Sequence, residues 1–165
     1  MSRIITFSRT FPAYHLKKGE QTLFVEKLML GFPPFEQITD LFSVLPLALD
    51  RLTEIYPKYH TIRSGSRWKI GDKFSPRVWS GKPYASKMIT IAPDIEIKQI
   101  WTFECDENGV ISVGGFYCDT RTEKQIAKND GLSLEDFKEW LVMPCFKSKK
   151  PFKGQIICWN ENLEY

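Results

Sequence analysis

Short runs of β-branched and aromatic residues, most of them bounded by turn residues, recur along the whole chain and are typical of β-strands. They predict strands at residues 3–8, 58–63, 73–79, 87–91, 95–104, 110–117 and 152–159. Asn108-Gly109 is a strong hairpin signal, so the strand that ends near residue 104 is expected to turn back directly into the next one.

Apolar residues recur at helical spacing in the segments between these strands. This pattern predicts helices at residues 21–30, 35–43, 46–56, 122–129 and 133–141. Gly31 follows the first helix as a C-terminal stop, and Pro46 divides the longest apolar pattern into two helices. Ser133 begins an N-cap box for the last helix, which Pro144 is expected to end.

The order of these elements predicts the fold class. The strands follow one another mostly through hairpins and do not alternate with helices, which argues against a doubly wound sheet. We therefore expect an α+β fold, a mostly antiparallel β-barrel of about six strands with helices packed on it. The 165 residues, 42% of them hydrophobic, suit a single domain at 1–165 with a helical insertion at about 20–56. The acidic tail from Asn160 is expected to fray.

Composition sets limits on partners and compartment. The net charge of +3 permits a polyanionic partner without requiring one. The four cysteines show no C-x-x-C spacing and only two histidines accompany them, so no metal and no cofactor are predicted. No apolar run is long enough to span a bilayer, and the N-terminus lacks the apolar core of a signal peptide. We expect a cytoplasmic protein with reduced thiols and no membrane partner.

The stretch with the most candidate functional groups is Lys58-Tyr59-His60-Thr61-Ile62-Arg63, which we call the focal stretch. Side chains alternate between the two faces of a strand, so Thr61 and Arg63 would share one face and Lys58 would lie on the other. A site that uses both Lys58 and Thr61 therefore requires the strand to begin after Lys58.

Four motifs occur in a fixed order along the chain: Ile5-Thr6-Phe7, then Lys58-x-x-Thr61-Ile62-Arg63, then Lys69-x-Gly71-Asp72, and finally Asp130-Gly131-Leu132-Ser133 before a helix. In this order and spacing the chain resembles the ASCH domain of the PUA-like superfamily over most of its length. The resemblance implies a PUA-like β-barrel with a cleft that binds RNA or a modified nucleoside.

Within that family, the focal stretch is most similar to the small 4-acetylcytidine amidohydrolases. In those enzymes a lysine and a threonine at this spacing act with a glutamate that precedes the late helix. The resemblance thus implies Lys58, Thr61 and Asp130 as catalytic residues. Asp130 stands where the family has glutamate and is one methylene shorter, and a misplacement of about 1 Å can cost roughly a hundredfold in rate.

Amide hydrolysis needs a nucleophile, a base and donors for the oxyanion. Thr61 can attack or position a water, and Lys58 can act as the base if its pKa is lowered, since at about 10.4 only roughly one amine in 2,500 is neutral at pH 7. Burial beside Arg63 would lower that pKa, and His60 is an alternative base. Each residue also has a structural interpretation: Lys58 as a solvated lysine, Thr61 as a strand former, Arg63 as a partner of Asp72, Asp130 as a turn former and His60 as a structural histidine.

Basic and aromatic residues interleave after the focal stretch, with Asp72 as the only acid among them. The set comprises Arg67, Trp68, Lys69, Lys73, Arg77, Trp79, Lys82, Tyr84 and Lys87. Such a mixture suits stacking on bases and neutralising phosphates. The ligand-binding residues predicted from both stretches are Arg63, His60, Arg67, Trp68, Arg77, Trp79, Lys82 and Tyr84. A solvated basic face with its aromatic rings in the core is the structural alternative.

Three hypotheses for the function remain open at this point. The first is a binding module whose cleft holds RNA or a modified nucleoside without chemistry. The second is an amidohydrolase that deacetylates 4-acetylcytidine through Lys58, Thr61 and Asp130. The third is a protein-interaction domain with no nucleic-acid role.

Overall fold

The computed structural model describes residues 2–32, 41, 43 and 45–165, and these residues form an α+β fold with two mostly antiparallel sheets. The first sheet comprises β1 (Arg3–Thr6), β3 (Lys73–Trp79), β4 (Met88–Thr90) and β5 (Ile95–Glu96). β1 runs parallel to β3, whereas β4 and β5 are antiparallel to it.

The second sheet is entirely antiparallel and has the order β2-β9-β6-β7-β8. Its strands are β2 (His60–Ser64), β6 (Gln99–Cys105), β7 (Ile111–Val113), β8 (Phe116–Tyr117) and β9 (Phe152–Cys158). The predicted hairpin at Asn108-Gly109 is confirmed between β6 and β7, with Gly109 at a φ of 83°. The strands predicted at 73–79 and 152–159 are confirmed as β3 and β9.

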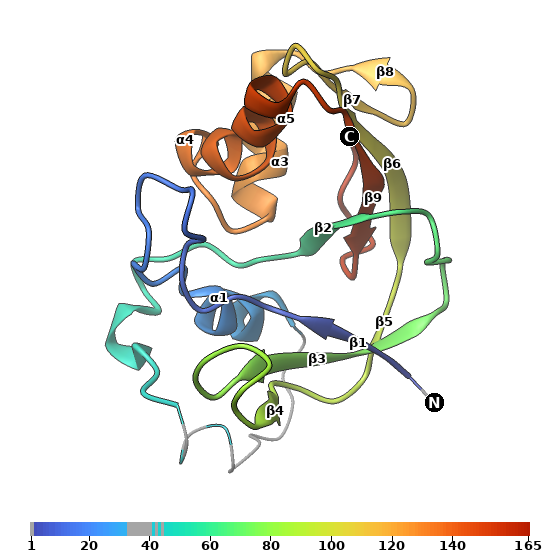
Figure 1. Cartoon of the computed structure of the whole chain (residues 1–165). Coiled ribbons are helices and arrows are strands. Elements are labelled where there is room, and N and C mark those ends of the chain that lie inside the picture. The colour runs from blue at the N-terminus through green and yellow to red at the C-terminus, as the bar shows by residue number, and fades with distance from the viewer. Residues whose placement is uncertain (1, 33–40, 42, 44) are drawn as a thin grey trace.

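The two sheets are connected on one side and open on the other. The chain passes from the first sheet into the second between β5 and β6, while β1 and β2 are edge strands of their sheets (Figure 1). A side-chain contact bridges these two edges: the Arg63 guanidinium donates to the Thr6 carbonyl at 2.5 Å. Pairing among the described strands gives two sheets and does not close them into one barrel.

The helices belong to two groups. α1 (Phe24–Gly31) follows the N-terminal strand and loop. α3 (Thr120–Asn129), α4 (Leu134–Phe137), the π-helical turn η2 (Lys138–Val142) and α5 (Met143–Ser148) gather beside the second sheet (Figure 1). The predictions at 21–30 and 122–129 are confirmed as α1 and α3. The Ser133 cap is also confirmed, because its hydroxyl accepts from the Asp136 amide at 3.0 Å.

Two predictions about the helices are wrong. Residues 46–56 contain only the 3-10 turn η1 (Leu49–Arg51), in which i→i+3 bonds replace the α-helical pattern: the Arg51 amide donates to the Ala48 carbonyl and the Glu54 amide to the Arg51 carbonyl. Pro144 does not end the last helix. It lies in the first turn of α5, directly after the π-helical turn η2, and the helical chain continues through it. Most of the helix predicted at 35–43 lies outside the described residues.

The C-terminal tail is packed against the domain and does not fray as predicted. The Gln99 side-chain amide donates to the carbonyls of Asn160 and Leu163. The Tyr165 ring contacts Trp101, with 4.9 Å between ring centroids, and its hydroxyl accepts from the Asn129 amide at 2.9 Å. These contacts tie the tail to both β6 and α3.

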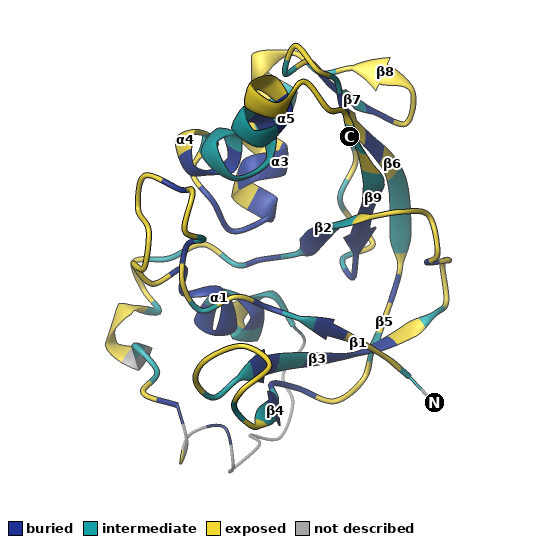
Figure 2. Cartoon of the chain, in the orientation of Figure 1, coloured by how far each residue is buried: buried dark blue, intermediate teal, exposed yellow. Residues whose placement is uncertain are grey.

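The hydrophobic core lies between the two sheets and under the helices, as the dark strands and inner helix faces of Figure 2 show. Trp159 occupies the centre of the aromatic part of this core. Its ring packs against Phe74 of β3 at 5.8 Å, Phe32 after α1 at 5.5 Å and Phe7 after β1 at 6.4 Å between centroids. Trp159 therefore connects the end of β9 to the first sheet.

Gly31 allows the backbone of α1 to approach the segment that precedes β2. A Cβ atom built on Gly31 would lie 2.0 Å from the Lys58 carbonyl oxygen. In the same place the Lys58 amide donates to the Lys27 carbonyl of α1 at 2.9 Å. The close approach requires a glycine even though Gly31 does not have a positive φ.

We expect Gly31→Ala to destabilise the fold by about 1–3 kcal/mol, since the Lys58 backbone must move to admit the new carbon and overpacking has costs of this size. The better helix propensity of alanine offsets at most about 1 kcal/mol of this loss. Urea unfolding monitored by circular dichroism measures the difference. Gly81→Ala is the matched control, because its Cβ would meet Ser86 at an ordinary 3.5 Å. Equal midpoints for the two variants would contradict the role of Gly31.

Candidate functional site

A cleft of about 260 Å³ opens at the edges of the two sheets, between β1 and β2. It brings together six of the side chains predicted from the sequence: Lys58, Thr61, Arg63, Trp79, Tyr84 and Asp130. The remaining wall is formed by Thr6, Phe7, Ser8, Phe24, Ile62, Pro83, Leu132, Trp140 and Leu141. The cleft therefore joins residues of three of the four sequence motifs, from β1, the start of β2 and the turn after α3, in one place.

Lys58 lies immediately before β2, as the alternation argument requires. Its side chain is 1% exposed, and its amine donates to both the backbone carbonyl and the Oδ1 atom of Asp130, each at 2.5 Å. The amine also lies 4.4 Å from the centroid of the Phe24 ring. Lys58 is thus held by a carboxylate, a carbonyl and an aromatic face, and it is not a solvated surface lysine.

The C-terminal end of α3 positions Asp130. Asp130 is the C-cap of this helix and its amide donates to the Ile126 carbonyl. Gly131 follows with a φ of 81°, which lets the chain reverse toward Ser133. The Tyr59 amide donates to the Asn129 carbonyl at 2.8 Å, so the segment before β2 is tied to this end of α3. The Lys58 amine therefore faces the negative end of the α3 dipole.

Burial opposes charge on both members of the pair. It lowers the pKa of the Lys58 amine, an effect that Asp130 counteracts and the Arg63 guanidinium reinforces. It raises the pKa of the Asp130 carboxyl, against the attraction of Lys58, Arg63 and Lys27. Both pKa values therefore shift toward neutral pH, which makes the neutral amine and the protonated acid easier to form than they are in water.

Lys27 is a second lysine at this site that sequence reasoning did not identify. Its amine donates to the Gly131 carbonyl at 2.6 Å. Burial and the nearby Lys58 lower the pKa of Lys27 to about 8. Lys27 thus fixes the turn after Asp130 and adds positive charge beside Lys58.

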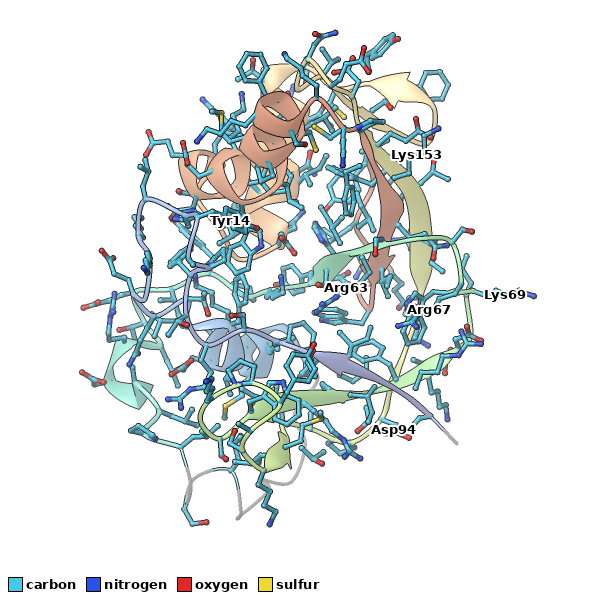
Figure 3. The ribbon with its side chains drawn as sticks, in the orientation of Figure 1. Tyr14, Arg63, Arg67, Lys69, Asp94 and Lys153 are labelled. Atoms are coloured by element: carbon cyan, nitrogen blue, oxygen red, sulfur yellow. The ribbon has the colours of Figure 1, made fainter. Side chains whose placement is uncertain are left out.

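Arg63 lies between the edges of the two sheets, and Figure 3 shows it in the interior of the molecule. It donates to the Thr6 carbonyl, and its guanidinium carbon lies 5.5 Å from the centroid of the Phe7 ring. Burial lowers the pKa of Arg63. The alternative pairing of Arg63 with Asp72 is wrong, because Asp72 instead lies 3.8 Å from the Arg3 guanidinium.

His60 lies behind Asp130 and does not line the cleft. Its Nδ1 atom is 3.6 Å from the Asp130 Oδ1 atom, and neither ring nitrogen has a hydrogen-bond partner among the described residues. The pKa of His60 is well below its usual value, because the ring is buried and lies near the Lys58 charge. This histidine packs edge-on against Tyr165 and lies beside Asp130, outside the lining of the cleft.

The four other residues predicted to bind ligand lie outside the cleft lining. Trp68 is 3% exposed, and its ring packs edge-on against Phe74 in the core. Arg67 covers the Trp68 ring at 5.3 Å, and the Arg77 side chain donates to the Ser75 hydroxyl at 3.2 Å. Lys82 is exposed on the loop that precedes β4. Lys69 projects outward in Figure 3, away from Arg63.

Several residues of the cleft carry no sequence signal for their position. Phe24 comes from α1, Trp140 from η2 and Ser8 from the segment after β1. Leu132 follows Asp130 directly in the fourth motif, so it is the one such residue that the motif indicates. Phe24 and Trp140 stack at 5.6 Å between centroids and form an apolar wall beside the lysine.

Comparison of the chain with models of known protein families, with curated proteins and with solved structures gave no match. Among the described residues, no group of three or more histidine, cysteine, aspartate or glutamate side chains is arranged to hold a metal ion. No helix within the same residues has the length and apolar character needed to cross a membrane.

The two single variants of the ion pair should respond to pH in opposite directions. Asp130→Asn leaves a buried amine whose folded pKa lies below the unfolded value, so stability lost near neutral pH returns as pH rises toward 10.5. Lys58→Met leaves a buried carboxyl with a raised folded pKa, so its stability falls as pH rises above about 3.9. Each single variant should lose roughly 3–5 kcal/mol where its remaining group is charged.

Urea unfolding between pH 5 and pH 10 measures both slopes. The double variant Lys58→Met/Asp130→Asn is the control, since it buries no unpaired charge and should recover much of the loss. Parallel slopes for the two single variants would refute a buried, mutually dependent pair.

Proposed function

We propose that this protein is an amidohydrolase of the ASCH type that removes the acyl group from an N4-acylated cytidine nucleoside. The observation that carries the proposal is the meeting of the Lys58 amine and the Asp130 carboxylate, 2.5 Å apart, in a cleft that Thr61 also lines. Lys58 and Asp130 lie 72 positions apart in sequence, so the three residues come together only through the fold.

The proposed chemistry uses the lowered pKa of Lys58. The Thr61 hydroxyl attacks the acyl carbon, or positions the water that attacks, while the neutral Lys58 amine accepts the proton. The C–N bond then breaks and the proton passes to the departing N4 amine of the base. If Thr61 has attacked, water hydrolyses its ester and releases the carboxylic acid. Asp130 orients the Lys58 amine and, as a carboxylate, stabilises the positive charge of the ammonium that forms when Lys58 accepts the proton.

The finer fold that we propose is a PUA-like barrel opened at one seam. In support, the chain is continuous between the two sheets at β5 and β6, whereas the edges of β1 and β2 face each other across Arg63. The cleft lies at this open seam, so the exposed edges give a ligand access to Lys58.

Two aromatic rings at the cleft suit a flat ligand. Trp79 and Tyr84 lie 5.3 Å apart between ring centroids, and Tyr84 is 92% exposed. Tyr84 also has a φ of 63°, a conformation that costs energy for a bulky residue and is found preferentially at functional sites. A pyrimidine base would stack against these rings with its N4 substituent toward Lys58.

A second candidate function is binding of RNA or a modified nucleoside without chemistry. The exposed Tyr84 and the neighbouring Lys82 favour it, since stacking and phosphate contacts need no base or nucleophile. This candidate and the hydrolase share the same cleft and differ in whether the acyl group is released.

Incubation with 4-acetylcytidine should release acetate and cytidine, and Lys58→Ala should lower the rate by about 10²–10⁴-fold because it removes the base. Chromatography of cytidine measures the product. Lys69→Ala, which removes an outward-pointing lysine, is the matched control and should retain the wild-type rate. Binding of the nucleoside without any release of acetate, even at high protein concentration, would exclude the hydrolase and leave the binding candidate.

Tyr84→Ala should weaken nucleoside binding by roughly 5- to 150-fold, because one base stack contributes about 1–3 kcal/mol. Isothermal titration calorimetry with cytidine measures the change. Tyr84→Phe keeps the ring and should bind like the wild type. An unchanged affinity in Tyr84→Ala would show that the exposed ring takes no part in binding.

A further inference from the structure

A second hollow of about 310 Å³ adjoins the cleft. The two share Phe7, Ser8, Trp79 and Pro83, so a common wall formed by Trp79 and Pro83 separates them. The hollow is lined further by Arg9, Thr10, Gln21, Val78 and Gly81. Its polar lining thus comes mainly from the segment that continues from β1 past the cleft.

Arg9 provides the only charge in the lining of this hollow among the described residues. The side chain is half-buried, and its guanidinium makes no hydrogen bond or ion pair with any residue that the structure describes. Three other arginines have polar partners: Arg3 lies near Asp72, Arg51 near Glu54, and Arg63 donates to the Thr6 carbonyl. Glu26 lines a small neighbouring cavity together with Arg9, and its carboxylate accepts from the Ala48 amide.

The backbone around Arg9 is fixed on both sides. The Thr22 amide donates to the Arg9 carbonyl at 2.9 Å, and the Thr22 hydroxyl donates to the Ser8 carbonyl at 2.7 Å. Thr10 forms an isolated antiparallel bridge with Gln21. The guanidinium is therefore presented from a rigid support, which reduces the ordering cost of binding.

We propose that this hollow is the phosphate subsite of the cleft and that Arg9 binds the phosphate of a nucleotide ligand. The proposal rests on the proposed function, because it takes the base to lie in the cleft against Trp79. A nucleotide whose base occupies the cleft carries its phosphate past the shared wall, and the hollow there offers the Arg9 guanidinium and the Gln21 side-chain amide as donors. Guanidinium groups bind phosphate oxygens in a bidentate manner, and among the described residues no carboxylate lines the hollow to compete.

The phosphate can belong to a free mononucleotide or to one residue of an RNA strand, and the chemistry at Arg9 is the same in both cases. The subsite therefore changes the expected substrate from a bare nucleoside to a phosphorylated one. It also gives a role to Arg9, which is half-buried next to a cleft and has no hydrogen-bond or ion-pair partner among the described residues.

The test compares the affinities of cytidine, cytidine 5′-monophosphate and a short cytidine oligoribonucleotide for the intact chain, measured by calorimetry at fixed salt. We expect the monophosphate to bind at least about tenfold more tightly than cytidine, since a charge-assisted hydrogen bond contributes about 1.5–3 kcal/mol. Arg9→Gln should abolish this difference and leave the affinity for cytidine unchanged. Arg9→Lys, which keeps the charge without the planar fork, should retain part of it.

Arg121→Gln is the matched control, because it removes one positive charge at the exposed start of α3 and should keep the full preference for the monophosphate. An oligonucleotide that binds more tightly than the monophosphate, with that gain lost in Arg9→Gln, assigns the phosphate to an RNA strand. Equal binding of the two assigns it to a mononucleotide. Inorganic phosphate should compete with the monophosphate and not with cytidine.

Equal affinities for cytidine and its monophosphate in the wild type would overturn the subsite, and so would a preference that survives Arg9→Gln. Because these measurements use unacylated ligands, they do not depend on hydrolysis. A protein that prefers the monophosphate but releases no acetate refutes the proposed hydrolase alone. A protein that hydrolyses acetylated nucleoside and nucleotide with equal kcat/KM refutes the subsite alone.

Discussion

The buried contact between Lys58 and Asp130 is the interaction on which the arrangement of this molecule depends. It requires the segment before β2, the last turn of α1 and the C-terminal end of α3 to meet within hydrogen-bond distance. Backbone hydrogen bonds from the Lys58 amide to the Lys27 carbonyl and from the Tyr59 amide to the Asn129 carbonyl hold these segments together. Gly31 allows their close approach because it has no side chain. The charged groups lose their hydration, so the pair contributes less to stability than its short distances indicate. An apolar pair of similar volume would stabilise the fold at least as well, which favours a chemical role for a pair that faces a cleft.

The local charge balance supports such a role. Arg63 and Lys27 add two positive groups near one carboxylate, so Asp130 does not neutralise its surroundings. A lysine that shares one carboxylate with two other cations has a lower pKa than a lysine that is the only cation near a carboxylate. The C-terminal carbonyl of α3 works in the opposite direction, since it accepts from the Lys58 amine and favours the charged form. The amine is therefore held in a defined place while its pKa is lowered, two properties that a general base requires.

Sequence reasoning predicted the elements that depend on local pattern and missed those that depend on distant packing. Alternation required β2 to begin after Lys58, and it begins at His60. The resemblance in motif order paired Asp130 with Lys58, and the two side chains are in contact although they lie 72 positions apart. Alternation cannot say which face of a segment is buried, so Trp68 was assigned to the ligand although it packs against Phe74 in the core. Phe24 and Trp140 carry no pattern that relates them to Lys58. Apolar spacing also does not distinguish an α-helix from the i→i+3 turns that occupy part of 46–56, where the Ala48 amide bonds to the distant Glu26 side chain.

The position of the open seam accounts for the separation of the two proposed subsites. A phosphate bound next to Lys58 would stabilise the ammonium form and raise its pKa, which would weaken the base that the reaction needs. Arg9 lies beyond the wall formed by Trp79 and Pro83, so an anion held there is separated from the amine by protein and by the stacked base. The segment from Thr6 to Arg9 contributes to both places, first through the Thr6 carbonyl that accepts from Arg63 and then through the Arg9 side chain that lines the hollow. One extended segment can thus bind the charged part of a nucleotide while keeping that charge away from the chemistry.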